Sequence, residues 1–471
     1  MEKYKKLFNN SLVFAIGNFG SKIINFIMVP LYTYTLTTQQ YGTLDLITTT
    51  VNLLIPFVTL TIEQAVIRFA VQKVKDRPDD SILTTSLFFC AFMNSISLIL
   101  IFFLFHFFGF NMQYQFYFIV LIILNSFQSI LLQFTRGIEK IKEFAINGIL
   151  QTILIAGFNI LFLVNFKMGL DGYFKSLILS ILLSILYLVF VIKAWKRISI
   201  KYFDFEFLKD MLVYSVPLLP NNTMWWLVNN STRYIILYFL GASANGLFAV
   251  ANKIPSLITM LTSIFQQAWQ LSAFEEYESS DRSVFYSTIF KYYYQFLILS
   301  GIILVTLSQP IVYYFVEYSY YESWKIIPPL ILAVIYQTFS GFIGTIYTAS
   351  MKTRGMFISS ILSAFVAVFA NLLFIPIFGL TGAGIGTTMA FIIMLIYRLI
   401  DTRKYVTITI DYVCFFSNNI LFIFQWIILT ADFNISLKLK YSLAAFVLCA
   451  SFILNRKLVD TFVFRLFRKS H

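Results

Sequence analysis

The chain has little charge and few of the residues that enzymes use for chemistry. Charged residues make up 12% of the 471 positions, and there are two histidines and three cysteines. Cys90, Cys414 and Cys449 lie far apart in apolar segments, so they predict neither a disulfide framework nor a zinc site. His106 and His471 are the two histidines, so the sequence lacks the histidines that a metal centre or a catalytic triad would need.

Nucleotide-binding loops and long hydrophilic loops are also absent from the sequence. It has no Walker-type phosphate loop, which argues against direct ATP hydrolysis. The glycine-rich segment 382–386 opens an apolar run with no soluble strand before it, so it favours close helix packing over dinucleotide binding. The longest loop, Ser272–Ser283, is acidic and polar and predicts a solvated connection.

Long apolar runs dominate what is present. Hydrophobic residues make up 59% of the chain and the mean hydropathy is +0.79, which is typical of a polytopic membrane protein. We predict an all-α fold of about fourteen transmembrane helices. The expected spans are residues 11–34, 43–66, 82–106, 115–134, 146–165, 170–192, 211–239, 245–271, 286–307, 326–350, 356–377, 380–400, 408–429 and 438–455.

Basic residues are concentrated in alternate loops. With the N-terminus in the cytoplasm, most of the 35 Lys and Arg residues fall in cytoplasmic segments, which is the positive-inside pattern. We therefore expect a multi-pass protein of the cytoplasmic membrane with both termini in the cytoplasm. The net charge of +13 then sets topology and gives no reason to expect a nucleic-acid partner. Lys438 and Lys440 fall on the outer side, which leaves open whether spans 13 and 14 both cross.

Three short motifs recur in the same order in the two halves of the chain. The pairs are Leu36 to Gly42 with Leu240 to Gly246, Asn159–Phe162 with Asn371–Phe374, and Gly169–Gly172 with Gly379–Gly382. They predict two six-span lobes that insert with the same orientation, with the substrate path in a cavity between them. The expected domains are a lobe at 1–200, a lobe at 201–405, and an extra helix pair with a basic cytoplasmic tail at 406–471.

Prolines fall in the first span of each lobe. Pro30 lies in span 1, and Pro217 and Pro220 lie in span 7. Proline removes a backbone donor and bends a helix, so these positions predict either hinges for a gating motion or static kinks.

Span 1 carries a lysine near its middle. Asn18, Ser21, Lys22 and Asn25 are spaced to form one polar face on an otherwise apolar helix. A lysine at the bilayer centre costs roughly 2.5–3.5 kcal/mol, so we expect Lys22 to face a water-filled or ligand-filled interior. The alternative is a structural lysine paired with a carbonyl or carboxylate inside the bundle.

Three further spans carry polar stripes at helical spacing. They contain Asp45, Asn52, Thr59, Glu63 and Arg68 in and after span 2, Asn222, Trp226, Asn229 and Arg233 in span 7, and Asn252, Lys253, Ser256, Thr259, Ser263, Gln267 and Gln270 in span 8. Together with Lys22, the cations Arg68, Arg233 and Lys253 predict a site for a phosphate or diphosphate. The amides, hydroxyls and tryptophan, with Asn18 and Asn25, suit a glycan.

Other interpretations of these polar residues stay open. Amides and hydroxyls often hold helices together in bilayers, and Arg68 is compatible with a simple positive-inside anchor. Asp45 and Glu63 are candidates for binding a coupling proton or sodium ion. No other cofactor and no metal are expected.

Several segments resemble the polysaccharide transporter branch of the MOP (multidrug, oligosaccharidyl-lipid, polysaccharide) superfamily. They are Asn18, Gly20 and Lys22 in span 1, the loop from Leu36 to Gly42, Arg68, Arg136-Gly137 and Gly379–Ala383. Wzx-type O-antigen and capsule flippases are the nearest type, and teichoic acid flippases are similar. The resemblance implies a MATE-like, V-shaped bundle with a cationic central cavity that alternates its access. Relatives often have an acidic residue before the position of Arg233, where this chain has Thr232, which puts ion coupling there in doubt.

The resemblance further implies movement of an undecaprenyl-diphosphate-linked oligosaccharide from the inner to the outer leaflet of the cytoplasmic membrane. Its expected partners are that lipid, the bilayer, a glycan polymerase and glycosyltransferases, and it is not expected to be an enzyme. One rival is a cation-coupled multidrug exporter of the same superfamily, which should prefer an acidic cavity. A second is a membrane glycan polymerase or ligase, which usually has a large catalytic outer loop. A third is a non-transporting scaffold for glycan assembly.

Overall fold

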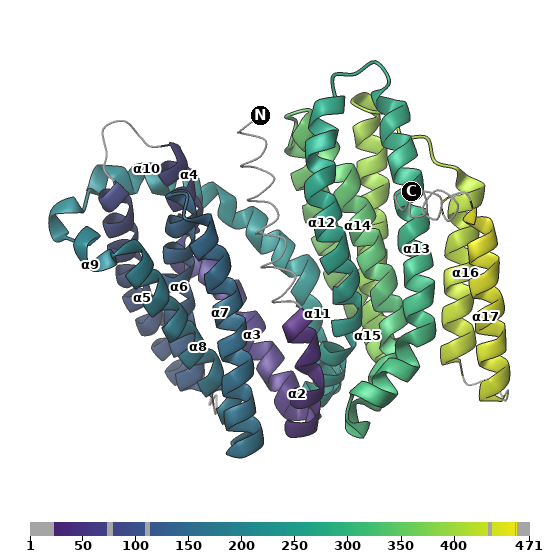
Figure 1. Cartoon of the computed structure of the whole chain (residues 1–471), viewed down its shortest axis with the longest axis horizontal. Coiled ribbons are helices and arrows are strands. Elements are labelled where there is room, and N and C mark those ends of the chain that lie inside the picture. Colours follow the sequence, from purple (N-terminus) through teal and green to yellow (C-terminus); the bar gives the residue numbers. More distant parts are fainter. Residues whose placement is uncertain (1–22, 73–78, 109–113, 432–435, 457, 459–471) are drawn as a thin grey trace, which may run out of the picture. The chain divides into compact units, whose positions relative to one another are not determined.

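The computed structural model describes residues 23–72, 79–108, 114–431, 436–456 and 458. Over these residues the chain is helical and contains no strand (Figure 1). They divide into two compact units, unit 1 within Met1–Trp226 and unit 2 within Leu227–His471. The predicted all-α polytopic fold is confirmed.

Unit 1 contains the helical elements from α2 to η3 and the beginning of α11. They are α2 (Val29–Thr35), α3 (Thr38–Thr59), α4 (Ile62–Gln72), α5 (Asp79–Phe108), α6 (Gln115–Gly137), α7 (Ile141–Asn159), the π-helical η1 (Ile160–Asn165), α8 (Gly169–Ile192), α9 (Ala194–Arg197), η2 (Ile200–Tyr202), α10 (Phe205–Ser215), η3 (Val216–Leu218) and the start of α11 (Leu219–Ala251). Helix α6 packs against α3, α4, α5 and α8, and α10 packs against α4. Residues 201–215, expected at the start of the second lobe, thus lie in unit 1.

Unit 2 contains the rest of α11, six further α-helices and two 3₁₀ elements among the residues that the structure describes. They are α12 (Lys253–Glu276), α13 (Arg282–Phe315), η4 (Tyr318–Ile326), α14 (Ile327–Ala349), α15 (Arg354–Asp401), η5 (Thr402–Lys404), α16 (Tyr412–Thr430) and α17 (Leu437–Leu454). Helix α14 is the most buried of these and packs along α12, α13 and α15. It forms the core of the unit.

Eleven helical segments of the described residues are long and apolar enough to cross a membrane. Two of them, Phe205–Glu276 and Arg354–Lys404, are longer than one crossing of about 20 residues needs. Both bend at a glycine in a conformation that other residues rarely adopt: Gly241 in α11 has φ 84° and ψ 176°, and Gly379 in α15 has φ 58° and ψ −140°. Counted with these bends and with the apolar helix Ile23–Thr35, the helices fit the fourteen expected spans.

The second span is interrupted, although we expected one helix over 43–66. Leu60 and Thr61 have φ of 48° and 54°, and they separate α3 from α4. Pro56 lies one turn earlier, and its carbonyl accepts from the Thr61 N–H at 3.1 Å. The Thr61 hydroxyl donates to the Ser215 carbonyl at the end of α10, 2.6 Å away. This long-range hydrogen bond stabilises the interruption, and its acceptor cannot be predicted from the local sequence.

The prolines of the first spans also lie at breaks. The helix containing Ile24 is interrupted by a turn at Met28 just before Pro30. Pro217 lies in the 3₁₀ element η3, which separates α10 from α11. Both predicted interruptions are present, whereas their role in gating stays a prediction.

The sequence repeat is matched by a repeated local structure in the two units. The Asn159 amide in α7 donates to the Tyr32 hydroxyl of α2 at 3.1 Å, and the Asn371 amide in α15 donates to the Thr232 hydroxyl of α11 at 2.9 Å. In each unit a buried asparagine therefore ties the fifth span to the first. A buried amide in a bilayer needs such a partner, which explains why the residue recurs.

The paired glycines also occupy equivalent places. Gly169 and Gly379 both have positive φ, at 57° and 58°. A Cβ added at Gly172 would meet Phe162, and one added at Gly382 would overlap the backbone of Phe374. The small residues let the fifth and sixth spans approach closely in both units, as predicted for the segment that follows Gly379.

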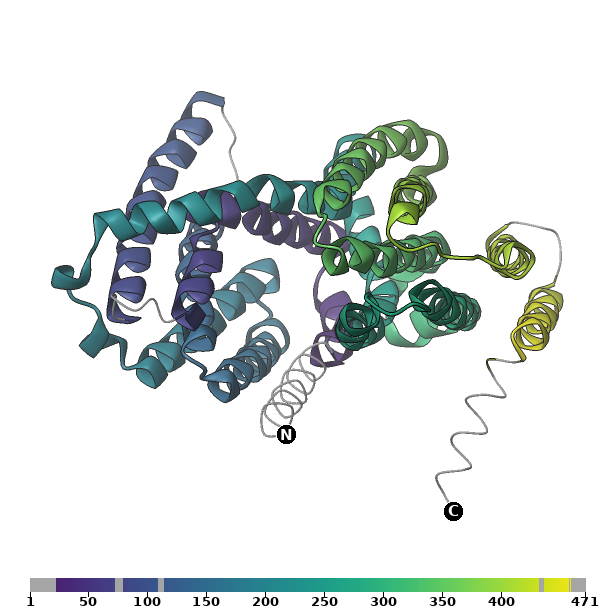
Figure 2. The same ribbon diagram turned by 90° about the horizontal axis from the view of Figure 1, so that it is seen from above.

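The C-terminal helix pair belongs to unit 2 by its bonds. Figures 1 and 2 both show α16 and α17 side by side, and both helices contact α13. Gln425 of α16 donates to Thr306 of α13 at 2.7 Å, and Tyr441 of α17 donates to Gln309 at 3.0 Å. Asp411 caps α16 and lies 2.9 Å from Lys291, whose hydrogen bond holds the pKa of Asp411 below its usual value.

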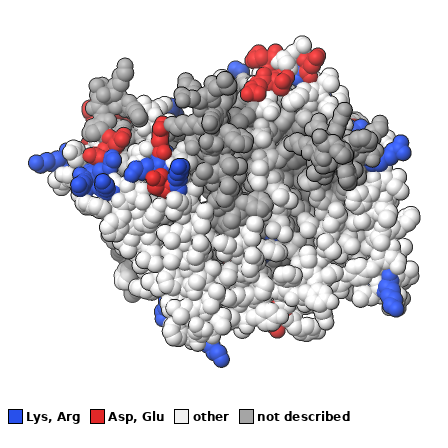
Figure 3. Space-filling model, in the orientation of Figure 1, with Lys and Arg blue, Asp and Glu red and all other residues white. Residues whose placement is uncertain are grey.

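Charged side chains lie at the ends of the helices. In unit 1, Figure 3 shows them gathered beside α9 and the start of α10, whereas the flanks of the helices are white. In unit 2 a red group marks the connection between α12 and α13, where Glu275, Glu276, Glu278 and Asp281 lie. An uncharged flank bounded by charged ends is the surface expected of a membrane-spanning bundle.

We expect Gly382→Ala to destabilise the protein, because the added methyl group overlaps the Phe374 backbone, which cannot move aside as a flexible side chain could. The expected loss is ~1–3 kcal/mol, measured as a fall in the thermal unfolding midpoint in detergent. Gly148→Ala is the matched control, because nothing lies within 4 Å of a Cβ there and alanine favours a helix by about 1 kcal/mol. Equal midpoints for the two variants would contradict the close approach at Gly382.

Candidate functional site

Arg233 lies on α11 among amides of its own unit. Its guanidinium donates to the Asn230 side-chain oxygen at 2.9 Å and to the Asn229 carbonyl at 3.3 Å. The side chain of the same Asn229 accepts from Gln337 of α14 at 2.9 Å, so amides from two helices lie close to the arginine. The side chain is half-buried, and Asn229 and Gln337 are within reach of solvent or ligand. Arginine in such a network presents a fixed set of donors, which suits a phosphate.

The bend in α11 brings an aromatic face to the same arginine. Gly241 separates two helical parts, and Phe248 of the second part places its ring 5.8 Å from the Arg233 guanidinium carbon. A cation over an aromatic ring gains roughly 0.5–1 kcal/mol at an exposed site. The bend therefore fixes the orientation of the cation.

The other predicted residues of unit 2 lie on α12 or at its start. Asn252, where α11 gives way to α12, donates to the Phe248 carbonyl at 2.8 Å, which is a bond within the helix. Lys253 follows it and is half-buried. Gln267 and Gln270 are exposed, so their amides are available on the surface of the unit.

In unit 1, Arg68 is exposed near the end of α4. Its guanidinium carbon lies 4.3 Å from the centre of the Tyr214 ring of α10, and Tyr214 also makes an edge contact with Phe69. The stacking holds one face of the guanidinium and leaves its donor edge at the surface. This arrangement fits both an anion guide and a positive-inside anchor, the two alternatives that the sequence left open.

Glu63 is a buried carboxylate at the break in span 2. Its exposed fraction is 9%, and one oxygen accepts from the Thr59 hydroxyl at 2.9 Å. Among the residues that the structure describes, it has no ion pair. Asp45, the second candidate for ion coupling, is half-buried on α3 one turn from the buried Tyr41.

Trp226 and Asn222 lie in the part of α11 that belongs to unit 1. The Trp226 indole donates to the Thr49 carbonyl of α3 at 3.2 Å, and Asn222 is half-buried one turn earlier. Asn25 is exposed. Lys22 and Asn18 lie outside the described residues.

The predicted residues therefore form two groups that the structure describes separately. In unit 2, Arg233 and Asn229 share one network, with Lys253 on the next helix. In unit 1, Arg68 and Glu63 lie on α4, and Trp226 contacts α3. The convergence of the cations from both lobes in one cavity stays a prediction.

Arg398 was not identified from the sequence as a buried residue. It is 1% exposed in α15, and it donates to the Ser340 carbonyl at 2.7 Å and to the Ser359 hydroxyl at 2.9 Å. It lies in a cluster of basic residues at the end of expected span 12, and the positive-inside pattern is enough to account for a basic residue there. The one signal was its place inside the span, opposite the serine pair Ser359-Ser360. Its closed shell of partners is that of a structural residue.

The described side chains offer no site for a metal ion, because no three of His, Cys, Asp and Glu cluster among them. What they offer is half-buried cations in unit 2, Arg233 and Lys253, and in unit 1 the exposed Arg68 and the half-buried amide of Asn222. Such donors bind anions and hydroxyl-rich groups without changing covalent bonds.

Comparisons with known proteins show the same fold. Lipid II flippase MurJ in an inward closed conformation aligns over 97% of this chain and 100% of its own length, with a TM-score of 0.68 and 15% identity. An inward-facing multidrug resistance MATE family transporter of the MOP superfamily aligns over 83% and 98%, with a TM-score of 0.66 and 14% identity. A MOP superfamily transporter from Pyrococcus furiosus, described as having a binding pocket of reverse polarity, aligns over 84% and 95%, with a TM-score of 0.58 and 14% identity.

The fold and the polar faces within its units therefore define the class: a multi-pass membrane protein with the architecture of MATE transporters of the MOP superfamily and of MurJ. No curated protein matches the sequence. Residues 7–270, more than half of the chain, match the family described as polysaccharide biosynthesis protein, and the chain belongs to that family. The resemblance drawn from the sequence is confirmed at this level.

We expect Arg398→Ala to destabilise the protein without a direct effect on a ligand. The substitution removes two close hydrogen bonds from a charged group, each worth roughly 1.5–3 kcal/mol, so the loss should be ~3 kcal/mol or more. Thermal unfolding in detergent measures it. Arg403→Ala, at an exposed position five residues along, should change stability by about 0.5 kcal/mol or less. An unchanged unfolding midpoint for Arg398→Ala would show that its bonds contribute nothing.

Proposed function

We propose that the chain is a flippase that moves an undecaprenyl-diphosphate-linked oligosaccharide from the inner to the outer leaflet of the cytoplasmic membrane. The product would serve the biosynthesis of a surface polysaccharide such as capsule, O-antigen or teichoic acid. The observation that carries the proposal is the half-buried Arg233, held by amides in a membrane protein of the polysaccharide biosynthesis family.

The charge of the candidate residues supports an anionic substrate. A half-buried cation inside a membrane protein is costly, and it is usually retained where it binds a substrate or lines a pathway. An exporter of cationic drugs would be served better by acidic residues. The Pyrococcus furiosus structure, with its pocket of reverse polarity, supports the idea that this fold accepts pockets of different charge.

The family and the fold support a lipid-linked substrate. Members are described by their role in polysaccharide biosynthesis, and MurJ, which is similar over nearly the whole chain, is described as a lipid II flippase. Lipid II flipping and the proposed reaction share one physical task, the passage of a polar headgroup through an apolar core. No bond of the lipid needs to form or break, so we infer that the chain is not an enzyme.

In the proposed mechanism, Lys22, Arg233 and Lys253 hold the diphosphate and Arg68 guides it from the cytoplasmic side. Amides and the Trp226 ring would contact the sugars. The lipid tail would stay in the bilayer while access alternates between the two sides of the membrane. Inward-facing and outward-facing structures of MATE transporters with this fold support such an alternation. Glycosyltransferases would act before this step, and a glycan polymerase would act after it.

Glu63 is the best candidate for coupling to an ion gradient. It is a buried carboxylate beside a helix break, and carboxylates in such places bind protons or sodium ions in transporters. Protonation or cation binding at Glu63 would change the charge beside Leu60 and Thr61, where the backbone is already in the left-handed region. Ion binding at Glu63 would then change the electrostatic environment of this strained backbone segment.

Lys22→Ala and Arg233→Ala should insert normally and lose surface glycan. A charge-assisted hydrogen bond to the diphosphate is worth roughly 1.5–3 kcal/mol, so each loss should lower transport by about tenfold or more. Leaflet-specific labelling of the lipid-linked intermediate measures it in cells depleted of the native protein. Labelled lipid should accumulate in the inner leaflet.

Lys167→Ala, at an exposed position just after η1, is the matched control and should transport normally. Normal surface glycan in the Lys22 and Arg233 variants would count against the assignment. Accumulation in the outer leaflet would indicate a polymerase, because the lipid would then have crossed without being used.

Glu63→Gln should uncouple transport from its ion gradient. The amide oxygen can still accept from Thr59, so the local structure is retained, but the side chain can no longer take up or release a proton and has lost the negative charge that attracts a cation. Proteoliposomes with an imposed proton or sodium gradient provide the measurement, with Asp45→Asn as the paired variant. If the Glu63→Gln protein still responds to both gradients as the parent does, Glu63 is excluded from coupling.

A further inference from the structure

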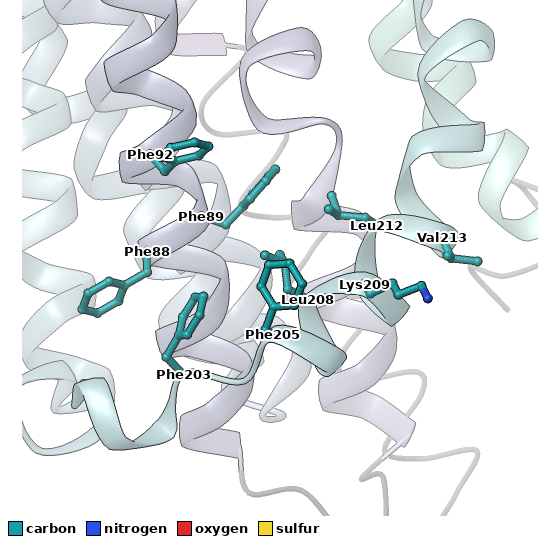
Figure 4. Close-up of a pocket in the computed structure, with 9 residues that line it drawn as sticks. All are labelled: Phe88, Phe89, Phe92, Phe203, Phe205, Leu208, Lys209, Leu212 and Val213. Atoms are coloured by element: carbon teal, nitrogen blue, oxygen red, sulfur yellow. The ribbon is translucent and has the colours of Figure 1, made fainter.

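Unit 1 contains an apolar groove that the proposed transport path does not use. It has a volume of about 850 Å³, within the ~300–1,000 Å³ usual for small-molecule sites. Phe88, Phe89 and Phe92 of α5 form one wall. The segment from Phe203 to Val213, which includes α10, forms the other wall (Figure 4).

The two walls are tied together, so the groove is formed in advance of any ligand. Ser81 donates to the Tyr202 carbonyl at 2.7 Å, and Thr84 donates to the Arg197 carbonyl at 3.2 Å. The Thr85 hydroxyl accepts from the Asp204 N–H at 3.2 Å. These bonds fix the chain before α10 against the first turns of α5. A site that is already ordered loses less entropy on binding.

The groove is lined by exposed aromatic rings. Phe205 is 75% exposed and Phe92 is 63% exposed, and the Phe88 and Phe203 rings lie 6.0 Å apart. Lining of this kind takes a hydrocarbon chain, because apolar contact is the favourable interaction that it offers. A soluble polar ligand would leave its hydrogen bonds unmade.

One charged residue, Lys209, lies at the edge of the groove. It is the sole charged side chain among the lining residues, and Figure 4 shows its amine directed away from the phenylalanine rings. The acidic residues of α10, Glu206 and Asp210, do not line the groove. The ligand therefore needs a hydrocarbon part for the rings and an anionic part for the lysine.

The surroundings indicate that the anionic part lies at a membrane surface. Between α8 and α10 the exposed residues are a mixture of aromatic or aliphatic and basic side chains. They are Lys193, Trp195, Lys196, Ile198, Ile200, Lys201, Tyr202 and Phe203. Tryptophan, tyrosine and lysine in such a mixture are typical of the level of the lipid headgroups.

We propose that this groove, between α5 and α10, binds a phospholipid with an anionic headgroup, whose acyl chain packs on the phenylalanines and whose phosphate pairs with Lys209. The occupant is a bilayer phospholipid and not the lipid-linked substrate. The inference is independent of the proposed transport, because it rests on this groove alone. Bound lipid would brace α10, which packs against α4 next to the break at Leu60.

The test measures binding to the purified full-length protein in detergent by native mass spectrometry. The probes are dioleoyl phosphatidylglycerol, dioleoyl phosphatidylcholine, glycerol 1-phosphate and undecaprenyl phosphate. Phosphatidylglycerol should bind about fivefold more tightly than phosphatidylcholine, the size expected for one lysine at an anionic surface. Glycerol 1-phosphate, which has no chain, should not compete.

Two variants separate the parts of the site. Lys209→Gln should lower phosphatidylglycerol binding to about the level of phosphatidylcholine and weaken phosphatidylcholine much less, because the choline cation already offsets the charge of that lipid's phosphate. Phe205→Ala should weaken both lipids by about fivefold, because it removes apolar contact. Lys142→Gln and Phe116→Ala are the controls, since both residues are exposed in unit 1 and neither lines the groove. They should change binding by less than about twofold.

Equal binding of the two phospholipids, or binding that Lys209→Gln leaves unchanged, would overturn the proposal. Competition by glycerol 1-phosphate would show a headgroup site without a chain, which also overturns it. Displacement of phosphatidylglycerol by much lower concentrations of undecaprenyl phosphate would assign the groove to the lipid carrier. None of these outcomes depends on flipping, so a failure here is distinguishable from a failure of the proposed function.

Discussion

A polar group that enters a bilayer must find its partner inside the protein, because lipid offers none. The helices satisfy the backbone, and several of the buried polar side chains form hydrogen bonds between helices. Asn159 and Asn371 each bond to the first span of their unit, and Arg398 is enclosed by Ser340 and Ser359. Arg233 also has partners in its own unit, but its side chain is half-buried and not enclosed, and we assign it to a ligand for that reason.

The same constraint made most of the fold predictable. Apolar runs of membrane-spanning length gave the spans, and the recurrence of Asn159 at Asn371 and of Gly172 at Gly382 indicated the two related halves. Each of these signals is local, because a span must be apolar along its own length. The residues that join one span to another within a unit, such as Asn159 and Asn371, lie inside these repeated motifs, so the repeat locates them as well.

Features that depend on distant contacts were not predictable in this way. The interruption at Leu60 and Thr61 is held by the carbonyl of Ser215, more than 150 positions away, and Pro56 is the one local signal near it, which does not identify that partner. The burial of Arg398 was not predicted, because its partners Ser340 and Ser359 lie on other parts of unit 2. The candidate site was predicted by residue type and spacing, which identify Arg233 and Asn229 but not Gln337, the partner of the Asn229 side chain on α14.

The bonds of the C-terminal helices have a consequence for how the second half is built. Thr306 and Gln309 of α13 accept hydrogen bonds from Gln425 and Tyr441 of the helix pair. A shortened chain that ended after α15 would lose both donors and uncover this side of α13. The helix pair therefore covers the polar side of α13, and it must move together with that helix whenever the second half moves.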